Sequence, residues 1–362
     1  MLRKTIKTSM VQLAIFLLYV GGVLLHGTLT DWQPEEDLPV DVYAKSNKTI
    51  IEDSIISLAI WNMGYAGLGE ESDFFFDSGG FFMSNGKMIR ASEKSVQKNL
   101  DGAELFVKST EADFFLIQEV DLNSRRSYYT QQLDSLRAQR PDYAASYAAN
   151  YRVGRVPIPV LEPWRAYGKV EAGIASLSRW QPTAERRLQL PGSFDWPTRI
   201  FQLDRCLLIS RFQTVSDKEL VVINAHLSAY DKGGVLKKQQ MAFLQQLVTA
   251  EYEKGNYVIV GADWNQCPPF FPFDTFSPGK TDGYTQSNIA ADFVGEDWQW
   301  LYDPTVPSNR KLRSIYDPEN TFRTVIDFFL ISPNIRALKV KTLDQQFRFS
   351  DHQPVWVQLE LL

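Results

Sequence analysis

The sequence predicts a layered α/β domain that follows an apolar N-terminal segment. The chain has 362 residues, of which 44% are hydrophobic and 13% aromatic, so it can form a large packed core. Short, almost continuous runs of Val, Ile, Leu and Phe recur along it, as in strands that are buried on both faces. Amphipathic stretches with a helical period lie between some of these runs.

Residues 1–30 are predicted to target the chain for export. Basic residues up to Lys7 precede residues 10–25, which carry no charge, and this order is typical of a signal peptide. No small-x-small cleavage site follows, and extension to Leu29 approaches the roughly 20 residues of a membrane helix. The segment is therefore a signal peptide or, as we favour, an uncleaved membrane anchor. The positive flank stays in the cytoplasm, which places the rest of the chain outside it.

One large domain is expected after this segment. Residues 31–53, rich in Asp, Glu, Lys and Pro, are predicted to form a tether, and residues 54–362 contain no further linker or repeat. Eight strands are predicted, over residues 55–60, 114–117, 173–177, 206–210, 220–223, 257–260, 325–331 and 355–359. Long loops rich in Pro and aromatic residues are predicted over 67–91, 140–170 and 266–322.

Two amphipathic helices are predicted between these strands. The first begins after Ser92, a suitable N-cap, and the second ends near Gly255. The second helix lies between the strand that ends near His226 and the strand that ends near Gly261, so a β-α-β unit is expected there.

The composition limits the kinds of metal and redox site. The only cysteines are Cys206 and Cys267, which excludes a disulfide framework and a thiolate metal site but leaves open whether the two pair. With three histidines, a zinc site built from several imidazoles is almost excluded. The net charge of −5 argues only weakly against a nucleic-acid partner.

Polar side chains stand at the ends of six predicted strands. Each of them alone is more often a turn, surface or structural residue, but Asp327 lies among apolar residues and therefore needs a partner, for which a histidine is suited. Ligands of open α/β sheets bind at strand ends, so the six ends together suggest one common site. The residues are Asn62, Glu119, His226, Asp263, Asn265, Asp327, Asp351 and His352.

These residue types suit the hydrolysis of a phosphoester. Carboxylate and amide oxygens are the ligands that Mg²⁺ prefers, together with water and substrate phosphate. A histidine held by a carboxylate can orient or deprotonate a water. A second histidine and an amide can stabilise charge on the phosphoryl oxygens.

The ordered stretches "WN", "QEVD", "GIASLS", "NAHLSAYD", "GADWN", "ID" and "SDH" resemble the endonuclease/exonuclease/phosphatase (DNase I-like) superfamily over roughly residues 54 to 362. "WNMGYAGLG", "DFFFDSGG" and "GNYVIVGADWN" are similar to an uncharacterised bacterial branch of it. The resemblance implies a four-layered α/β/β/α sandwich with two central mixed sheets.

The resemblance also implies roles for individual residues. Metal binding is expected from Asn62, Glu119 and Asp351. His352 is expected to act as general base or to orient the attacking water, with Asp327 holding its ring and Asp263 orienting the nucleophile. Asn265 and His226 would contact the phosphate.

Two substrate-binding residues are expected with less support. Arg126 matches an arginine that follows the glutamate motif in some branches, and a solvated surface charge is an equal alternative. The family tyrosine is assigned to Tyr151, with Tyr147 as a competitor. "VID" replaces the more usual Arg-Ile-Asp, and no basic helix or arm commits the site to duplex DNA.

The predicted function is an exported phosphoester hydrolase that depends on Mg²⁺ or Mn²⁺ and is tethered to the membrane unless the N-terminal segment is cleaved. Its substrate would be nucleic acid, a phospholipid head group or a phosphorylated metabolite, and we expect a monomer. The aromatic stretch "DFFFDSGGFF" can lie at a lipid interface or, as the sequence favours, pack beside the site. The alternatives of another class are a non-catalytic binding module on the same scaffold and a structural envelope protein.

Overall fold

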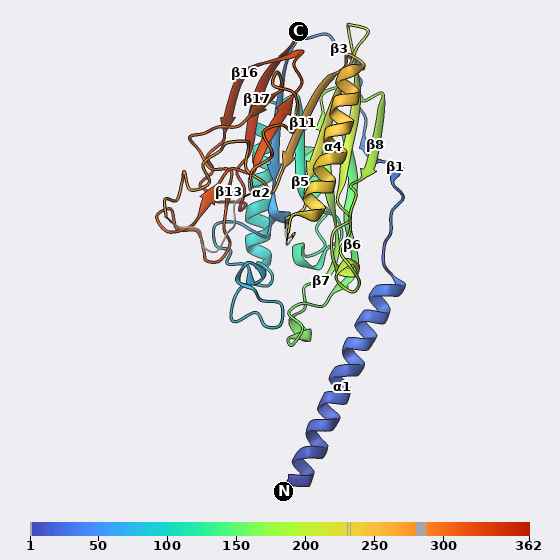
Figure 1. Ribbon diagram of the computed structural model, residues 1–362, viewed down its shortest axis with the longest axis vertical. Helices are drawn as coiled ribbons and strands as arrows, with labels where there is room; N and C mark the ends of the chain where they lie inside the picture. The colour runs from blue at the N-terminus through green and yellow to red at the C-terminus, as the bar shows by residue number, and fades with distance from the viewer. Residues whose placement is uncertain (1, 230, 232, 280–286) are drawn as a thin grey trace.

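The fold consists of a long N-terminal helix and a layered domain, shown in Figure 1 as a computed structural model. It describes residues 2–229, 231, 233–279 and 287–362. The helix, α1 (Leu2–Leu29), projects from one end of the domain, and the C-terminus lies at the opposite end.

Two mixed sheets form the centre of the domain. In the first, the order is β1-β8-β9-β10-β11-β15-β12, with β3 paired to β9; in the second it is β16-β17-β4-β5-β7-β6-β2. The first sheet contains β1 (Asp37–Pro39), β3 (Ile50–Ile51), β8 (Ala184–Gln189), β9 (Cys206–Thr214), β10 (Glu219–His226), β11 (Tyr257–Asp263), β12 (Gln299–Leu301) and β15 (Asp327–Ile331). The second contains β2 (Asp41–Ala44), β4 (Ile55–Asn62), β5 (Phe114–Asp121), β6 (Ala144–Val156), β7 (Gly168–Ser178), β16 (Ile335–Thr342) and β17 (Val355–Leu361). A separate pair is formed by β13 (Asn309–Arg310) and β14 (Arg323–Thr324).

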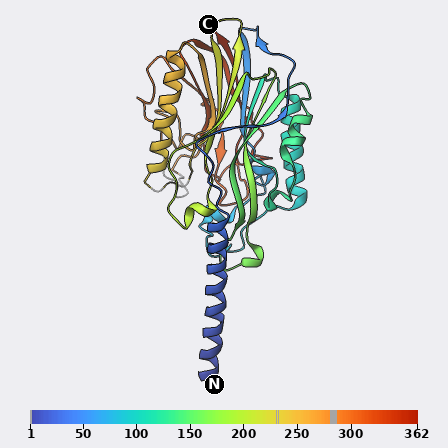
Figure 2. The same ribbon diagram turned by 90° about the vertical axis from the view of Figure 1, so that its right-hand side faces the viewer.

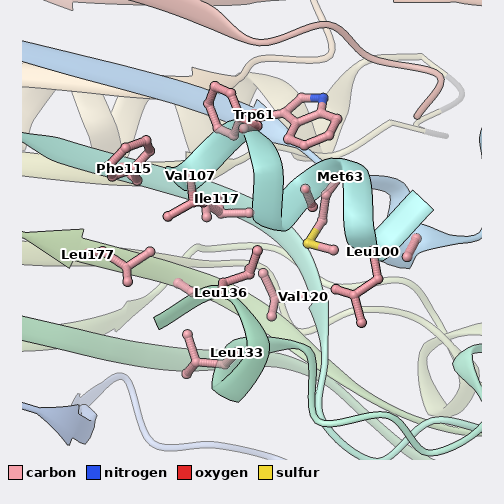
Figure 3. Close-up of a cluster of buried hydrophobic side chains, with 14 of the residues drawn as sticks. Trp61, Met63, Leu100, Val107, Phe115, Ile117, Val120, Leu133, Leu136 and Leu177 are labelled. Atoms are coloured by element: carbon pink, nitrogen blue, oxygen red, sulfur yellow. The ribbon is translucent and has the colours of Figure 1, made fainter. Parts of the chain in front are cut away.

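Helices cover the outer faces of the two sheets, so the domain has four layers (Figure 2). The helix α2 (Glu93–Ser109), with the short α3 (Gln132–Ala138), packs on the second sheet, and α4 (Val235–Glu253) packs on the first. Figure 3 shows the core under α2 and α3, where Leu100 and Leu136 belong to the same apolar cluster as Phe115 and Ile117 of β5. A separate core between the sheets joins residues such as Leu116 and Ile259. The predicted four-layered sandwich is confirmed.

All eight predicted strands and both predicted helices are present, but the predicted loop 266–322 includes the short β12 and β13, and the predicted loop 140–170 is wrong. Residues 140–170 contain β6, the longest strand of the second sheet, and not a loop. Its sequence, AASYAANYRVGRV, is rich in Ala, a weak strand former, and the strand is held by pairing along β7. Ser92 caps α2 as expected, since its hydroxyl accepts a hydrogen bond from Ser95 N–H at 3.1 Å. Cys206 and Cys267 are both free and buried.

The segment that joins α1 to the domain lies along both sheets. Residues 31–53, predicted as a tether, contribute the short strands β1, β2 and β3. Within α1, the span Lys4–Leu29 has a mean hydropathy of 2.0 in its most apolar 18-residue window, and the domain buries none of that window. By length and composition this helix can cross a membrane.

A tight contact between the sheets gives a first prediction. A Cβ added to Gly261 would lie 2.5 Å from Ile60 Cγ2 and 2.7 Å from Leu116 Cδ1. We expect Gly261→Ala to lower the free energy of unfolding by about 1–3 kcal/mol, because the packed core cannot absorb another methyl group without shifts. Urea denaturation would measure this loss.

The matched control is Gly295→Ala, where the nearest atom would lie 3.8 Å away. Its unfolding midpoint should stay close to that of the unmodified chain. Equal midpoints for the two variants would contradict the close sheet-to-sheet packing.

Candidate active site

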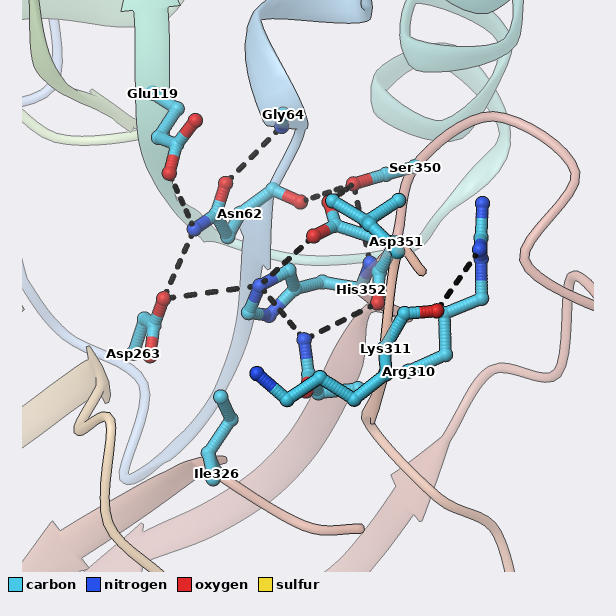
Figure 4. A network of polar contacts seen from close by, with 12 residues as sticks. Asn62, Gly64, Glu119, Asp263, Arg310, Lys311, Ile326, Ser350, Asp351 and His352 are labelled. Carbon is cyan, nitrogen blue, oxygen red and sulfur yellow. Dashed lines mark hydrogen bonds and ion pairs between the residues drawn. The ribbon is translucent and has the colours of Figure 1, made fainter. Parts of the chain in front are cut away.

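The register of the strands brings the predicted polar residues to one end of the sandwich. In the first sheet, parallel pairing of β10 and β11 sets His226 opposite Asp263, and antiparallel pairing of β11 and β15 sets Asp263 opposite Asp327. In the second sheet, β4 ends at Asn62 beside β5. The ends of both sheets therefore meet over one cluster of polar side chains (Figure 4).

The buried carboxylate of Asp263 connects the two sheets. Its Oδ2 accepts a hydrogen bond of 2.9 Å from Asn62 Nδ2, and it lies 3.2 Å from His226 Nε2 and 3.8 Å from His352 Nε2. Its Oδ1 accepts a hydrogen bond from Asn265 N–H at 3.0 Å. Asp263 is 1% exposed, so these polar contacts replace the water that the carboxylate loses on folding.

His352 is held by a carboxylate on one side of its ring. Its Nδ1 lies 2.8 Å from Asp327 Oδ2, which also accepts a 2.8 Å hydrogen bond from Ser308 Oγ. On the other side, Nε2 lies 3.0 Å from Asn309 Nδ2. A proton on Nδ1 satisfies both contacts, with the Nε2 lone pair accepting the Asn309 hydrogen bond, and this is the neutral tautomer that a general base requires once Nε2 turns to a water.

Burial and the neighbouring charges give the two histidines opposite properties. Burial lowers the pKa of His226 well below its usual value, and Arg205 lowers it further, so this ring is neutral. Burial also acts to lower the pKa of His352, but the negative charges of Asp327, Asp351 and Asp263 together outweigh it, and this pKa is raised well above its usual value. The Nδ1 atom of His226 is buried and has no hydrogen-bond partner among the described residues.

A bulge in β5 directs Glu119 toward the cluster. The pairing of β5 with β7 shifts between Ile117 and Val120, and Glu119 has a φ of 55°, in the left-handed region. Such a conformation is unfavourable for a residue with a side chain, and bulges near active sites re-aim side chains. The Oε1 of Glu119 accepts a 3.2 Å hydrogen bond from Asn62 Nδ2.

The carboxylates of Glu119 and Asp351 fit a hard divalent cation, whereas the amide oxygen of Asn62 is occupied by a hydrogen bond. Among the described residues, the nearest cation candidate found for Glu119 is His226 at 4.0 Å, and this ring is neutral, so the charge of Glu119 is poorly balanced. Burial raises the pKa of Asp351 to about 7, against the effect of His352 and with a further contribution from Glu119. A cation between the two carboxylates would balance the charge of Glu119 and favour the ionised form of Asp351. The amide of Asn62 points its nitrogen at Glu119 and Asp263, and its Oδ1 accepts a hydrogen bond from Gly64 N–H at 3.0 Å.

Another acidic group also has the composition of a metal site. Each of Asp263, Asp327 and His352 offers one ligand atom, and these three atoms lie within 4.8 Å of one another. However, Asp327 already pairs with the His352 ring and with Ser308, and a cation on these atoms would have to break those contacts. We therefore interpret this group as a hydrogen-bonded relay and the Glu119 group as the better cation site.

Cationic side chains near the first sheet were missed by the sequence analysis. Lys237, in the first turn of α4, donates a 3.0 Å hydrogen bond to the backbone oxygen of Asn265, and Arg205 Nη1 lies 3.4 Å from the backbone oxygen of His226. The positive charges of Lys237 and Arg205 stabilise a negatively charged group beside the cluster. Arg205 stands just before β9, and only the antiparallel pairing of β9 with β10 reveals that this position lies at the site end. Asn265 itself donates to Leu227 O at 2.9 Å.

Arg126 and Tyr151 lie in a buried group of tyrosine rings. Arg126 is 6% exposed, donates to Asp121 and Tyr167, and stacks 3.7 Å above the ring of Tyr65, so the alternative of a solvated surface charge is wrong. Tyr151 is also buried and donates a 2.9 Å hydrogen bond to Phe201 O. A direct contact of either residue with substrate stays a prediction.

Comparison with known families identifies the family to which this chain belongs. The family model described as "Endonuclease/Exonuclease/phosphatase family" matches residues 61–352, from the end of β4 to His352. The chain belongs to the endonuclease/exonuclease/phosphatase family. The members of this family are phosphoester hydrolases. No curated protein matches the chain significantly.

Solved structures of this family share the fold at low sequence identity. The endonuclease/exonuclease/phosphatase from Beutenbergia cavernae is 17% identical, with a TM-score of 0.53 over 85% of this chain and 72% of that one. The corresponding protein from Bacteroides vulgatus is 16% identical, with a TM-score of 0.51 over 86% and 100%. ANGEL2, described as a 2′,3′-cyclic phosphatase, is 14% identical, with a TM-score of 0.54 over 90% and 99%.

The pairing of Asp327 with His352 predicts a defined pH effect. If His352 must be neutral to act as a base, activity falls in acid as its raised pKa is crossed. Asp327→Asn removes the largest of the charges that raise this pKa, so we expect the acidic limb of the kcat profile to move to lower pH. The plateau of kcat should fall by about 10²–10⁴-fold, because the ring loses its orientation.

Initial rates across the pH range would measure both effects. Asp217→Asn, an exposed position in the turn between β9 and β10, is the matched control and should behave like the unmodified chain. An unchanged acidic limb together with an unchanged plateau would show that the pair has no role in catalysis.

Proposed function

We propose that the chain is an exported, membrane-anchored phosphoester hydrolase that uses Mg²⁺, or Mn²⁺, to activate attack by water. The observation that carries this proposal is the cluster around Asp263, where a carboxylate from one sheet lies within 3.8 Å of an amide and two imidazoles from both sheets. The family, whose members hydrolyse phosphoesters, supports the reaction class. The apolar α1 supports anchoring.

The residues divide into two groups in this mechanism. Glu119 and Asp351 would hold the cation, with Asn62 beside them. When bound, the cation would polarise a phosphoryl oxygen and stabilise the leaving oxygen. The negative charge of Asp263 and Asp351 near this position favours a cation over an anion.

The imidazoles would act on the water and on the phosphate. His352 Nε2 would accept a proton from the water as its oxygen attacks phosphorus, and Asp327 would stabilise the resulting imidazolium. Asp263 Oδ2, which lies between Asn62 and both rings, would orient that water. The neutral His226 would donate a hydrogen bond to the phosphoryl oxygens, and Asn265, Lys237 and Arg205 would add to their stabilisation.

Separate variants test the two groups. We expect Glu119→Gln and His352→Gln each to lower kcat/KM by at least about 10²-fold, because one weakens cation binding and the other removes the base. Hydrolysis of bis(p-nitrophenyl) phosphate, nicking of plasmid DNA and release of phosphate from small monoesters, each with Mg²⁺ and with EDTA, would measure this. Circular dichroism should stay unchanged for both variants.

Calorimetry separates the roles of these residues. Glu119→Gln should weaken Mg²⁺ binding, whereas His352→Gln should not, and Glu253→Gln at an exposed position of α4 is the control for both. Wild-type turnover in both active-site variants would refute the assigned roles. Cation binding without hydrolysis of any substrate would favour a binding module on this scaffold.

A further inference from the structure

An exposed apolar patch lies at the end of the domain from which α1 projects. It consists of Phe81, Phe82, Met83, Leu161 and Trp164, which we call the apolar rim. The exposed fractions of these residues run from 47% for Leu161 to 73% for Trp164. Large apolar side chains that gather on a surface in this way mark a contact with another apolar phase.

The apolar rim is held by a defined framework. Two backbone hydrogen bonds, from Val160 N to Phe81 O at 3.1 Å and from Leu161 N to Phe82 O at 3.0 Å, join its two segments. Beneath them, the buried carboxylate of Glu162 accepts a 2.9 Å hydrogen bond from Ser84 N–H. The exposed side chains therefore project from two backbone segments that are hydrogen-bonded to each other.

The aromatic stretch that contains Phe81 and Phe82 has a buried half and an exposed half. Phe75 is fully buried, and Phe74 and Phe76 pack in the same apolar cluster, so this half of the stretch is packed within the domain. Phe81 and Phe82, a few residues later, point away from that core. The two rings lie edge to face against each other and stay exposed.

The apolar rim, the active site and α1 share one end of the domain. Asp121, next to the active-site end of β5, pairs with Ala172 of β7, and the hairpin of β6 and β7 continues beyond that level to the pair Val156 and Gly168. The loop after this pair carries Leu161 and Trp164. Figures 1 and 2 show α1 leaving the same end of the sandwich.

Contacts with the domain locate the exit point of α1. A Cβ on Gly154 of β6 would lie 3.4 Å from His26, and one on Gly27 would lie 3.0 Å from Ile200. Trp196, another exposed aromatic residue, donates a 3.1 Å hydrogen bond from Nε1 to Thr28 Oγ1. Aromatic side chains at the end of an apolar helix are typical of the membrane–water interface.

We propose that the apolar rim enters the interface of the bilayer that α1 spans, which turns the active site toward that bilayer. The substrate class is then a phosphoester carried by a membrane lipid, and this part rests on the proposed hydrolase function. Two of the cations nearest the apolar rim are already paired, Arg165 with Glu162 and Lys87 with Asp73, so we assign the contact to apolar burial and not to charge. The contact therefore forms on vesicles without anionic lipid.

A spin label at Phe82 tests the contact without any need for activity. The full chain carries Phe82→Cys in phosphatidylcholine vesicles, and Val215→Cys, in the turn between β9 and β10 at the opposite end of the sandwich, is the control. Cys206 and Cys267 are at most 1% exposed and stay unlabelled. We expect the label at position 82 to be accessible to oxygen but shielded from a water-soluble nickel chelate, and the label at position 215 to show the reverse. Equal exposure to the nickel chelate at both positions would overturn the contact.

The double variant Phe82→Ser/Trp164→Ser tests the substrate class. Vesicles of equal parts phosphatidylcholine, phosphatidylethanolamine and phosphatidylglycerol present lipid phosphoesters, and bis(p-nitrophenyl) phosphate is the soluble substrate. We expect a loss of at least about tenfold on the vesicles and a change within about twofold on the soluble substrate. Val215→Ser should alter neither rate.

The possible failures are distinguishable. An unmodified chain that cleaves the soluble diester but no lipid would overturn the lipid assignment and leave the hydrolase function standing. A chain that cleaves neither with Mg²⁺ would overturn both, and the spin labels would still decide the contact. Equal losses on both substrates in the double variant would show that the apolar rim supports only the fold.

Discussion

The structure depends on the burial of one carboxylate, Asp263, at the junction of two sheets. A buried carboxylate is costly unless several donors surround it. Asn62 from the second sheet and Asn265 beside β11 donate to it, and His226 of β10 lies 3.2 Å away. A shift of one residue in any of these strands would turn the partner side chain to the other face of its sheet. The strand registers of both sheets must therefore be the ones that surround this carboxylate with hydrogen-bond donors.

The same few strand ends produce two histidines with different chemistry. His226 is buried with Arg205 nearby and stays neutral, whereas His352 is buried against Asp327 and is easily protonated. A neutral ring can donate one hydrogen bond to a substrate oxygen, and a ring paired with a carboxylate can take up a proton. Environments that separate the pKa values of two similar groups are a common means of assigning distinct roles.

The sequence predicted the parts of this site that follow from local pattern. Apolar runs that end in Asn62, His226 and Asp263 indicated both the strands and the common site, and Asp327 was expected to pair with a histidine. The structure shows that pairing with His352 at 2.8 Å. The ordered motifs were also sufficient to indicate the family that the comparison shows.

The parts that the sequence did not predict arise from tertiary contacts. Ser308 and Asn309 position Asp327 and His352, but they lie in a stretch with no apolar period and acquire their role only when β13 reaches His352. The Ala-rich β6 is a strand because β7 pairs with it. The bulge at Glu119 depends on the pairing of β5 with β7, and nothing in "QEVD" signals it.

Paramagnetic NMR with Mn²⁺ tests the central claim, that oxygen ligands from strand ends hold one cation beside two imidazoles. The chain has three histidines, and His26 on α1 lies outside the site and serves as the reference. In a chain with labelled histidines, a small amount of Mn²⁺ should broaden the ring signals of His226 and His352 far more than those of His26. Glu119→Gln should remove this difference. Equal broadening of all three rings, or selective broadening that survives Glu119→Gln, would contradict the account.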